Sequence, residues 1–573
     1  MSIPSPRVQQ LRLREHQIFL ILSIVIGIVA GLAAVLFTVA IEQTTHRLFG
    51  LAPSRGRLLM VPPLMSVVTG VMLAKFFPDV RGSGVPQTEA AYHLSKGVIR
   101  WRVPFGKFLT GVLCIGSGHS MGREGPSVQI GAGIASGVGR WLGLSPKLMR
   151  DLIPVGAAGA LAAAFNTPVA AVLFSLEEII GDMNATLIGS AVVASVASVV
   201  VERSILGNEP LFHVPAYHLV HPAELIAYAG LGIVGGLVSL IFCKSLLWLR
   251  GLFLRLPRWT KILQPAMGGL VIGLVLVVSP AIMGVGYDYV DQALNGGLLL
   301  KTMVAFCALK LAATVVSYAS GNAGGIFAPS LYIGAMAGGA VGLVVRHVAP
   351  FPTADPGAYA LVGMGTLFAG IIRAPMTSVF MIFEITQDYQ ILVPLMVANM
   401  LSFTISRRFQ PVPVYHSLLQ QDGIHLPSPS TRAGTTNRTA GHVMQTEITL
   451  LSPDLTIEQA RRLLGAEASP RYLVGDDHHL VGVVDFEDLE QAIAAGDGAR
   501  ALWSVVDHDF AHAHPDHAIE IVLDRLAQSG GILPVVSRTD ASHLEGVITL
   551  DGLLKRTEHA GDRHLTISDS TRR

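Results

Sequence analysis

The pattern of hydrophobic and polar positions divides the chain into a long apolar part and a shorter polar part. Uncharged stretches recur as far as about residue 410, and the first runs from 18 to 41. About 20 apolar residues cross the hydrocarbon core of a bilayer as a helix. We therefore predict a polytopic, all-α membrane domain over 17–418. Further uncharged stretches occupy residues 58–73, 152–176, 225–243, 265–287, 326–345 and 391–406.

The segment 1–16 precedes the first predicted membrane helix and carries Arg7, Arg12 and Arg14. Positive charge next to a membrane helix favours the cytoplasmic side. The uncharged stretch that follows is too long for the apolar region of a secretory signal peptide. We expect a membrane-anchored first helix with a cytoplasmic N-terminus.

Three segments rich in Gly and Pro interrupt the apolar part: GSGVP at 82–86, GREGP at 122–126 and GGIFAP at 324–329. Non-helical backbone at membrane depth persists only where protein or a water-filled cavity satisfies it. Paired interruptions in two halves of a chain indicate the binding site of a transporter. The second and third breaks suggest two related halves, about 17–202 and 222–406.

Each break has the composition of a helix start. Pro is favoured in the first helical turn, and a helix N-terminus offers unpaired N–H groups and a partial positive charge that attract anions. Three such termini meeting near the middle of the membrane would bind an anion without Lys or Arg. Ser83 and Tyr415 could add hydroxyl donors, although each one taken alone is more often a cap or an interfacial anchor.

Several carboxylates lie at the ends of apolar runs. Glu124, inside the second break, is compatible with a gate that competes with the anion or with a simple helix N-cap. Glu177 and Glu178 form either a solvated pair at the membrane edge or an entry point for protons. We interpret Glu384 and Asp388, which close a similar run in the second half, as a structural helix end.

The composition changes after Tyr415. Residues 419–440 are rich in Ser, Thr, Gly and Pro and are predicted to be a linker. A small α/β unit then appears twice, because LVGVVDFEDL parallels LEGVITLDGL. The two copies span 441–495 and 503–557, and the polar residues 558–573 are expected to be disordered.

Composition removes several classes of function. Only 14% of the residues are charged and the net charge is +1, so nothing indicates nucleic acid as a partner. Cys114, Cys243 and Cys307 are scattered through apolar stretches and indicate neither disulfides nor zinc. A transporter of divalent cations would need clustered carboxylates in its membrane helices. The acidic residues of this apolar part are scattered, so its sequence does not favour such a transporter. The GHSMG segment at 118–122 matches a hydrolase motif, but that motif requires an α/β sheet, so we do not expect an enzyme.

With these segments in place, the chain resembles the CLC family of chloride channels and chloride/proton antiporters over about residues 17–420. GSGVP resembles the first anion-site motif of the family, GREGPSVQIG (122–131) the second and GGIFAPSLYIG (324–334) the third. AAAFNTPVAAVLFSLEE (162–178) and RAPMTSVFMIFEIT (373–386) follow in the expected order. The resemblance implies a bundle of tilted, partly broken helices in two inverted halves.

The resemblance also implies roles for matched positions. The hydroxyls of Ser83 and Tyr415 and the backbone amides of Ile326 and Phe327 would contact a central anion. A Ser at the position of Ser83 favours chloride over nitrate or fluoride. The family further implies a homodimer with one pore in each subunit.

Two glutamates carry the implied coupling to protons. Glu124 would be the external gating glutamate, and Glu178 would be the internal proton glutamate. The presence of Glu178 favours chloride/proton antiport, while a passive channel gated by voltage or pH is the alternative and a cation transporter regulated by the tail is a more distant one. We expect a bacterial inner membrane protein with both termini cytoplasmic.

The tail resembles a pair of CBS domains, which often bind adenine nucleotides. The first copy has Asp488 at the expected place but Asp485 where a hydroxyl residue is usual. The second copy has Thr549, but Asp551 lies one position early. Each nucleotide motif is incomplete, so dimerisation or packing is an equal alternative, and no other cofactor is expected.

Overall fold

The computed structural model divides the chain into two compact units, Met1–Leu426 and Pro427–Arg573. We call them the membrane unit and the tail unit and describe each by itself. The structure describes residues 6–50, 52–182, 185–207, 211–212, 214–215, 217, 219–426, 439–446, 448–464, 471–476, 479–517, 519–549 and 552–553.

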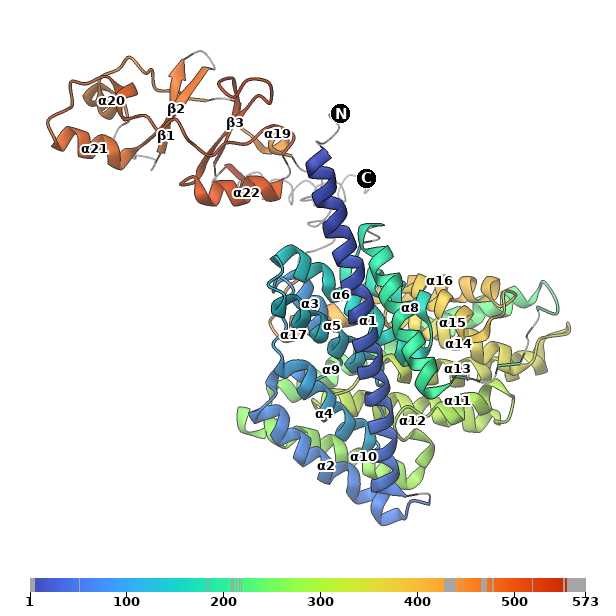
Figure 1. Cartoon of the computed structure of the whole chain (residues 1–573). Helices are drawn as coiled ribbons and strands as arrows, with labels where there is room; N and C mark the ends of the chain where they lie inside the picture. Colours follow the sequence, from blue (N-terminus) through green and yellow to red (C-terminus); the bar gives the residue numbers. More distant parts are fainter. Residues whose placement is uncertain are drawn as a thin grey trace, which may run out of the picture. The chain divides into compact units, whose positions relative to one another are not determined.

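The membrane unit is helical, as its apolar stretches predict (Figure 1). Seven helices within its described residues are long and apolar enough to cross a membrane. Its elements are α1 (Pro6–Phe49), α2 (Arg55–Lys75), η1 (Pro78–Val80), α3 (Val85–His93), α4 (Arg102–Gly116), α5 (Glu124–Trp141), α6 (Pro146–Phe165), α7 (Pro168–Phe174), η2 (Ser175–Ile180), α8 (Ala185–Leu206), α9 (Glu224–Arg255), η3 (Arg258–Ile262), α10 (Gln264–Val278), η4 (Pro280–Ile282), α11 (Tyr287–Leu294), α12 (Leu300–Ala319), α13 (Phe327–Val348), α14 (Pro356–Ile371), α15 (Pro375–Thr386), α16 (Leu392–Phe409) and α17 (Val414–Gln421).

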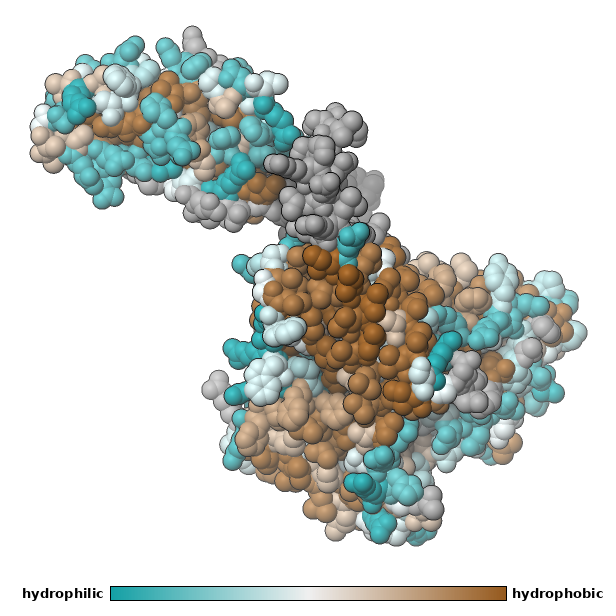
Figure 2. Space-filling view, in the orientation of Figure 1, coloured by the Kyte–Doolittle hydropathy of each residue, from teal (hydrophilic) through white to brown (hydrophobic). Residues whose placement is uncertain are grey.

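The surface of the membrane unit is apolar over a broad face that includes α1 (Figure 2). On this helix Ile21 is 61% exposed and Leu36 is 53% exposed. Apolar patches of this extent are rare on soluble proteins and indicate contact with a membrane. The exposed side chains therefore fit a lipid environment.

The membrane unit contains the same series of elements twice. Lys107 of α4 and Lys310 of α12 each lie 17 residues before the start of the next long helix, at Glu124 and Phe327 respectively. The short helices η1 and η4 occupy matching places before α3 and α11. The elements from α2 to α7 therefore correspond in order to those from α10 to α15.

Paired glycines repeat with these elements. Gly82 and Gly84 precede α3, Gly284 and Gly286 precede α11, and all four have positive φ, between 54° and 103°. Other residues rarely adopt this conformation, whereas Gly does so at no steric cost. Both halves therefore need glycine for the same turn.

Close helix crossings are made by glycines in both halves. A Cβ on Gly131 of α5 would collide with the Gly156 carbonyl of α6, and one on Gly156 would collide with the Gly131 carbonyl. Gly334 of α13 and Gly363 of α14 repeat this arrangement. Small residues let membrane helices approach closely, because packing rather than the hydrophobic effect holds them together.

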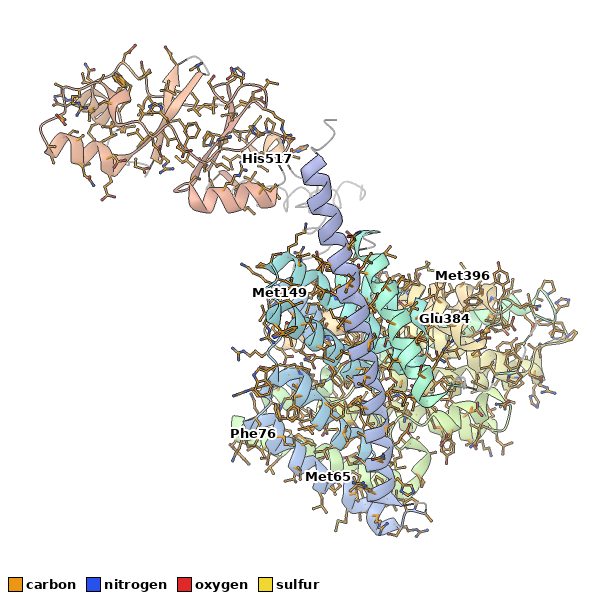
Figure 3. The ribbon with its side chains drawn as sticks, viewed as in Figure 1. Met65, Phe76, Met149, Glu384, Met396 and His517 are labelled. Atoms are coloured by element: carbon orange, nitrogen blue, oxygen red, sulfur yellow. The ribbon has the colours of Figure 1, made fainter. Side chains whose placement is uncertain are left out.

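Two carboxylates cap helices in the opposite half. Both oxygens of Glu384 accept hydrogen bonds at the start of α7, from the N–H groups of Val169 (2.9 Å) and Ala170 (2.8 Å). Glu177 does the same at the start of α15, from Met376 (3.1 Å) and Thr377 (2.8 Å). The structural interpretation of Glu384 agrees with this arrangement, although the helix it caps is not its own (Figure 3).

The tail unit consists of two small α/β modules. In each, two antiparallel strands form a sheet whose register shifts by one residue near the end of the first strand. The two strand pairs lie within the two predicted copies, 441–495 and 503–557. The elements are α19 (Ala440–Val443), α20 (Ile457–Leu463), β1 (Arg471–Asp476), β2 (His479–Asp485), α21 (Phe486–Ala494), η5 (Leu502–Val505), α22 (Ile519–Gln528), β3 (Ile532–Val536) and β4 (Leu544–Thr549).

Some boundaries differ from the sequence expectation. The helix α1 begins inside 1–16, and α17 extends into the predicted linker 419–440. The second difference has a clear cause, because Arg250 of α9 donates to Gln421 (2.9 Å) and pairs with Asp422 (2.6 Å). The predicted disorder of 558–573 concerns residues outside the described ranges.

The glycine crossing of α5 and α6 predicts opposite effects for two alanine substitutions on one helix. Gly131→Ala should lower the free energy of unfolding by about 1–3 kcal/mol, because the new methyl group overpacks the crossing. Gly137→Ala should leave stability unchanged or raise it, because nothing lies within 4 Å of a Cβ at that position. Thermal unfolding of the detergent-purified protein checks both, and equal melting temperatures would contradict the assigned crossing.

Candidate functional site

The three breaks begin helices, as predicted, and they are joined to one another by backbone hydrogen bonds. Gly122 and Gly325 exchange both of their N–H···O bonds, each 2.8 Å long, in an antiparallel bridge. Gly82 donates to Asn322 (3.2 Å) and accepts from Gly324 (3.1 Å). Since Gly122 and Gly325 are equivalent positions of the two halves, their antiparallel pairing agrees with inverted repeats. The N-termini of α3, α5 and α13 therefore lie close together.

Two buried lysines support the turns that precede α3 and α11. Lys107 donates to the carbonyls of Val80 (2.8 Å) and Gly82 (2.7 Å). Lys310 donates to the carbonyls of Ile282 (3.0 Å) and Gly284 (2.7 Å) in the other half. Both side chains are fully buried, and no ion pair to a carboxylate is found for either among the described residues. They satisfy carbonyls that no helix satisfies.

The hydroxyls of Ser83 and Tyr415 lie beside each other although 332 residues separate them in sequence. Both residues are fully buried, and among the described residues neither hydroxyl oxygen has a hydrogen-bond partner of ordinary geometry. Such buried, unsatisfied groups are rare in native structures and need an explanation. A ligand that accepts hydrogen bonds would provide one.

Ile326 and Phe327 begin α13 and are also buried, with 0% and 2% of their surface exposed. Backbone N–H groups in the first turn of a helix have no acceptor within the helix. The ring of Phe327 packs against Phe165, Phe174 and Phe368, with centroids 4.4–5.6 Å apart. This packing fixes the start of α13.

Glu124 is fully buried at the start of α5. Its Oε1 accepts a hydrogen bond from the Tyr287 hydroxyl (2.7 Å). Its Oε2 has no bond of ordinary geometry but lies near the N–H of Ala328 in the first turn of α13. The guanidinium of Arg123 lies 5.8 Å from the Tyr287 ring centroid. The carboxylate therefore lies between two helix N-termini, where an anion is favoured.

Glu178 lies in the π-helical turn η2 and is 8% exposed. Glu89, Glu177 and Arg373 surround it closely enough to interact electrostatically. Glu89 is bonded to His416 of α17, with 2.5 Å between Oε1 and Nε2. Tyr415, the residue before this histidine, senses the charges of both Glu178 and Glu124. Tyr415 is therefore near enough to both glutamates to interact with each of them.

Sequence reasoning missed Tyr287, Glu89, His416 and the two supporting lysines. Tyr287 bonds to Glu124 across 163 residues and His416 bonds to Glu89 across 327 residues. Only the two lysines could have been found from the sequence. Each is a charged residue inside an apolar stretch, and such a residue usually has a functional or structural role.

A cavity of about 520 Å³ adjoins the first break. Gly82 and Tyr318 line it, and the Tyr318 hydroxyl accepts from the Ser83 N–H (3.4 Å). Arg81, Arg250 and Lys261 also line it. Arg250 pairs with Asp422, whereas Arg81 donates to a carbonyl, that of Lys261 (2.6 Å). Arg81 therefore carries positive charge to the cavity without a carboxylate partner in the described part of the chain.

The predicted nucleotide residues of the tail unit have other contacts. Asp485 forms a two-point ion pair with Arg471 (2.5 and 2.7 Å), and this pair lowers the pKa of Asp485. Asp488 lies in the first turn of α21, and the Thr549 hydroxyl accepts from the Gly552 N–H (3.1 Å). Asp551 lies outside the described residues. Adenine nucleotide binding stays a prediction.

The hydrolase-like segment has a structural role in this fold. His119 and Ser120 are buried, with His119 bonded to Ser66 (2.6 Å) and Ser120 bonded to Thr314 (2.9 Å). The segment therefore joins helices rather than forming a nucleophile turn. Among the described residues, no group of three or more His, Cys, Asp or Glu could hold a metal ion.

Comparison with known proteins agrees with this geometry. Residues 65–407 match the family model described as voltage gated chloride channel, and residues 440–495 match that of the CBS domain. The H(+)/Cl(-) exchange transporter ClcA of Vibrio cholerae serotype O1 (strain M66-2) is 30% identical over 416 residues, which is 70% of this chain and 89% of that protein. ClcA of Yersinia pseudotuberculosis serotype IB (strain PB1/+) is 31% identical over 418 residues, covering 70% and 87%.

The solved structures to which the chain is similar include proteins of the same kind as these relatives. A slow cyanobacterial Cl-/H+ antiporter has a TM-score of 0.64 at 27% identity, covering 70% of this chain and 97% of its own. A eukaryotic CLC transporter, at 20% identity and a TM-score of 0.62, shares the fold over 93% of this chain and 97% of its own. The chain therefore belongs to the voltage gated chloride channel family, the CLC family, and is a multi-pass membrane protein with a CBS domain that follows its membrane unit in the sequence.

Proposed function

We propose that this protein exchanges chloride for protons across a membrane. The observation that carries the proposal is the meeting of three helix N-termini around two buried, unpaired hydroxyls and one carboxylate. The names of the bacterial relatives and of the cyanobacterial neighbour, all proton/chloride exchangers or antiporters, support the choice of ions.

Chloride would bind between the hydroxyls of Ser83 and Tyr415 and the N–H groups of Ile326 and Phe327. These ligands are neutral donors, so they stabilise an anion without an ion pair. A site of this kind binds an anion strongly enough to admit it and weakly enough to release it.

Glu124 would act as the gate. Its carboxylate occupies a position that favours anions, so it competes with chloride while it is charged. Protonation removes the charge, and with it the attraction to the helix N-termini. The side chain can then leave, and an anion takes its place, so that the arrival of a proton and the passage of chloride are linked.

Glu178 would pass protons between solution and this gate. It lies in the cluster with Glu89, His416 and Arg373. Ionisable groups inside membrane segments commonly serve as proton relays. Tyr415 interacts with both Glu178 and Glu124, so the proton route and the anion site meet at this residue.

The protein would be placed in a bacterial inner membrane as a homodimer, with both termini in the cytoplasm. The basic residues Arg7, Arg12 and Arg14 before the first membrane helix support this orientation. The ions, the lipid bilayer and a second copy of the chain would then be its partners.

Replacing Glu178 tests the coupling. In liposomes with an imposed chloride gradient, the parent protein should drive protons uphill, and Glu178→Gln should abolish proton movement while chloride flux continues. The adjacent Glu177→Gln is the matched control, because Glu177 caps α15; it should keep the coupling and lower the melting temperature. Chloride flux without proton movement in the parent would make the protein a passive channel.

The hydrogen bond from Tyr287 should hold the Glu124 gate in its closed position. Tyr287→Phe removes the hydrogen bond to Glu124, and bonds to a charged group contribute about 1.5–3 kcal/mol. The gate should open more readily, so chloride turnover at neutral pH should rise by roughly tenfold or more. Tyr289→Phe, on the same helix α11, is the control. Unchanged turnover in Tyr287→Phe would show that this bond does not hold the gate closed.

Arg81 should concentrate chloride in the cavity beside the first break. Arg81→Gln should raise the chloride concentration for half-maximal flux severalfold at low ionic strength, and the difference should shrink in concentrated salt of an impermeant anion, because salt screens charges. Arg81→Lys should restore most of the effect. Arg102→Gln, which does not line the cavity, should match the parent. If the chloride concentration for half-maximal flux is the same in all variants, Arg81 does not concentrate chloride in the cavity.

A further inference from the structure

The tail unit contains a basic pocket that the predicted nucleotide motifs do not use. Four histidines occur in the segment HDFAHAHPDH (508–517). Three of them line a pocket of about 600 Å³ together with two arginines, and Figure 3 labels one of the three, His517. We call this the histidine pocket and define it by His512, His514, His517, Arg525 and Arg538.

The backbone orients the three imidazole rings. The Nδ1 atoms of His512 and His514 lie at the carbonyls of Phe510 (3.3 Å) and Val536 (3.0 Å). Nδ1 of His517 accepts a hydrogen bond from the His514 N–H (3.2 Å). One nitrogen of each ring is thus engaged by the backbone. The three Nε2 atoms make no hydrogen bond within the described residues, so they are available to a ligand.

The pocket has an excess of positive charge. Among the described residues, its lining includes Arg525 and Arg538 but no carboxylate. Arg525 donates to the His512 carbonyl, and Arg538 pairs with Asp516 outside the lining (2.9 Å). Burial, followed by the charges of Arg525 and His514, lowers the pKa of His517, and Asp516 opposes this effect. Positive charge therefore disfavours protonation until an anion enters.

The ligand chemistry favours an anion over a metal ion. In neutral His517 the proton must be on Nε2, because Nδ1 accepts a hydrogen bond. That nitrogen can donate to an anion but has no lone pair for a metal. Two guanidiniums would also repel a cation, whereas their N–H groups suit the oxygens of a phosphate or sulfate.

We propose that the histidine pocket binds a tetrahedral oxyanion, either as a free ion or as the phosphate group of a larger ligand, and takes up protons as it does so. A bound anion stabilises the imidazolium form of the lining histidines. By linkage, protonation must strengthen anion binding by the same factor. Binding should therefore tighten as pH falls through the range in which histidines titrate.

The test uses the full-length protein in detergent micelles and sodium sulfate as the probe. Sulfate keeps its charge across the whole range, so any pH dependence belongs to the protein. Titration calorimetry should show one site per chain that binds about tenfold more tightly near pH 6 than near pH 8. Repeating the titration in buffers of different ionisation enthalpy should show proton uptake on binding.

Variants locate the site. His512→Gln and His514→Gln should each weaken sulfate binding and reduce the proton uptake. His508→Gln is the matched control, because it belongs to the same segment, bonds to the Val481 carbonyl (3.0 Å) and does not line the pocket. It should bind as the parent does. Unchanged melting temperatures and chloride flux would show that each variant is folded.

Further probes distinguish a free oxyanion from the phosphate group of a larger ligand, and an oxyanion from a metal ion. If inorganic phosphate and a nucleoside monophosphate bind with equal affinity, the ligand is the free ion. If the nucleotide binds much more tightly, the ligand is the phosphate group of a larger molecule. The proposal is overturned by absence of sulfate binding at both pH values, by binding that pocket variants leave unchanged, by binding without proton uptake, or by stoichiometric binding of zinc in place of the oxyanion.

Discussion

Satisfying non-helical backbone inside the membrane is the constraint on which the rest of this structure depends. An unpaired N–H or C=O group in hydrocarbon costs several kcal/mol, so three helices can begin in the interior only if the breaks satisfy one another. The paired bonds of Gly122 and Gly325 and the bonds from Lys107 do this. The same backbone bonds bring three positive helix ends together, so the proposed anion site follows from the way the broken backbone is satisfied.

The two halves share a scaffold but not its chemistry. Val285 takes the place of Ser83 between the matching glycines, and Phe327 takes the place of Glu124 at the matching helix start. The second half therefore contributes backbone donors and packing, while the first half contributes the hydroxyl and the carboxylate. A duplicated fold has thus given one functional pathway rather than two equivalent ones.

The helix starts and the positions of Ser83, Glu124 and Glu178 were predictable from sequence, because glycine, proline and isolated carboxylates are conspicuous in apolar runs. The contacts that define the site were not. Tyr287 reaches Glu124 across 163 residues and His416 reaches Glu89 across 327, and no local pattern encodes pairs so distant. Tertiary contact also extended α17 beyond the compositional boundary, through Arg250.

The reciprocal caps formed by Glu177 and Glu384 have a consequence for how the chain is made. The start of α7 receives its cap from a residue that the ribosome adds more than 200 positions later. Until that part emerges, the first half holds a membrane helix with unsatisfied N–H groups. The first half therefore waits for the second, whereas the cap of α15, Glu177, is already in place when that helix is made.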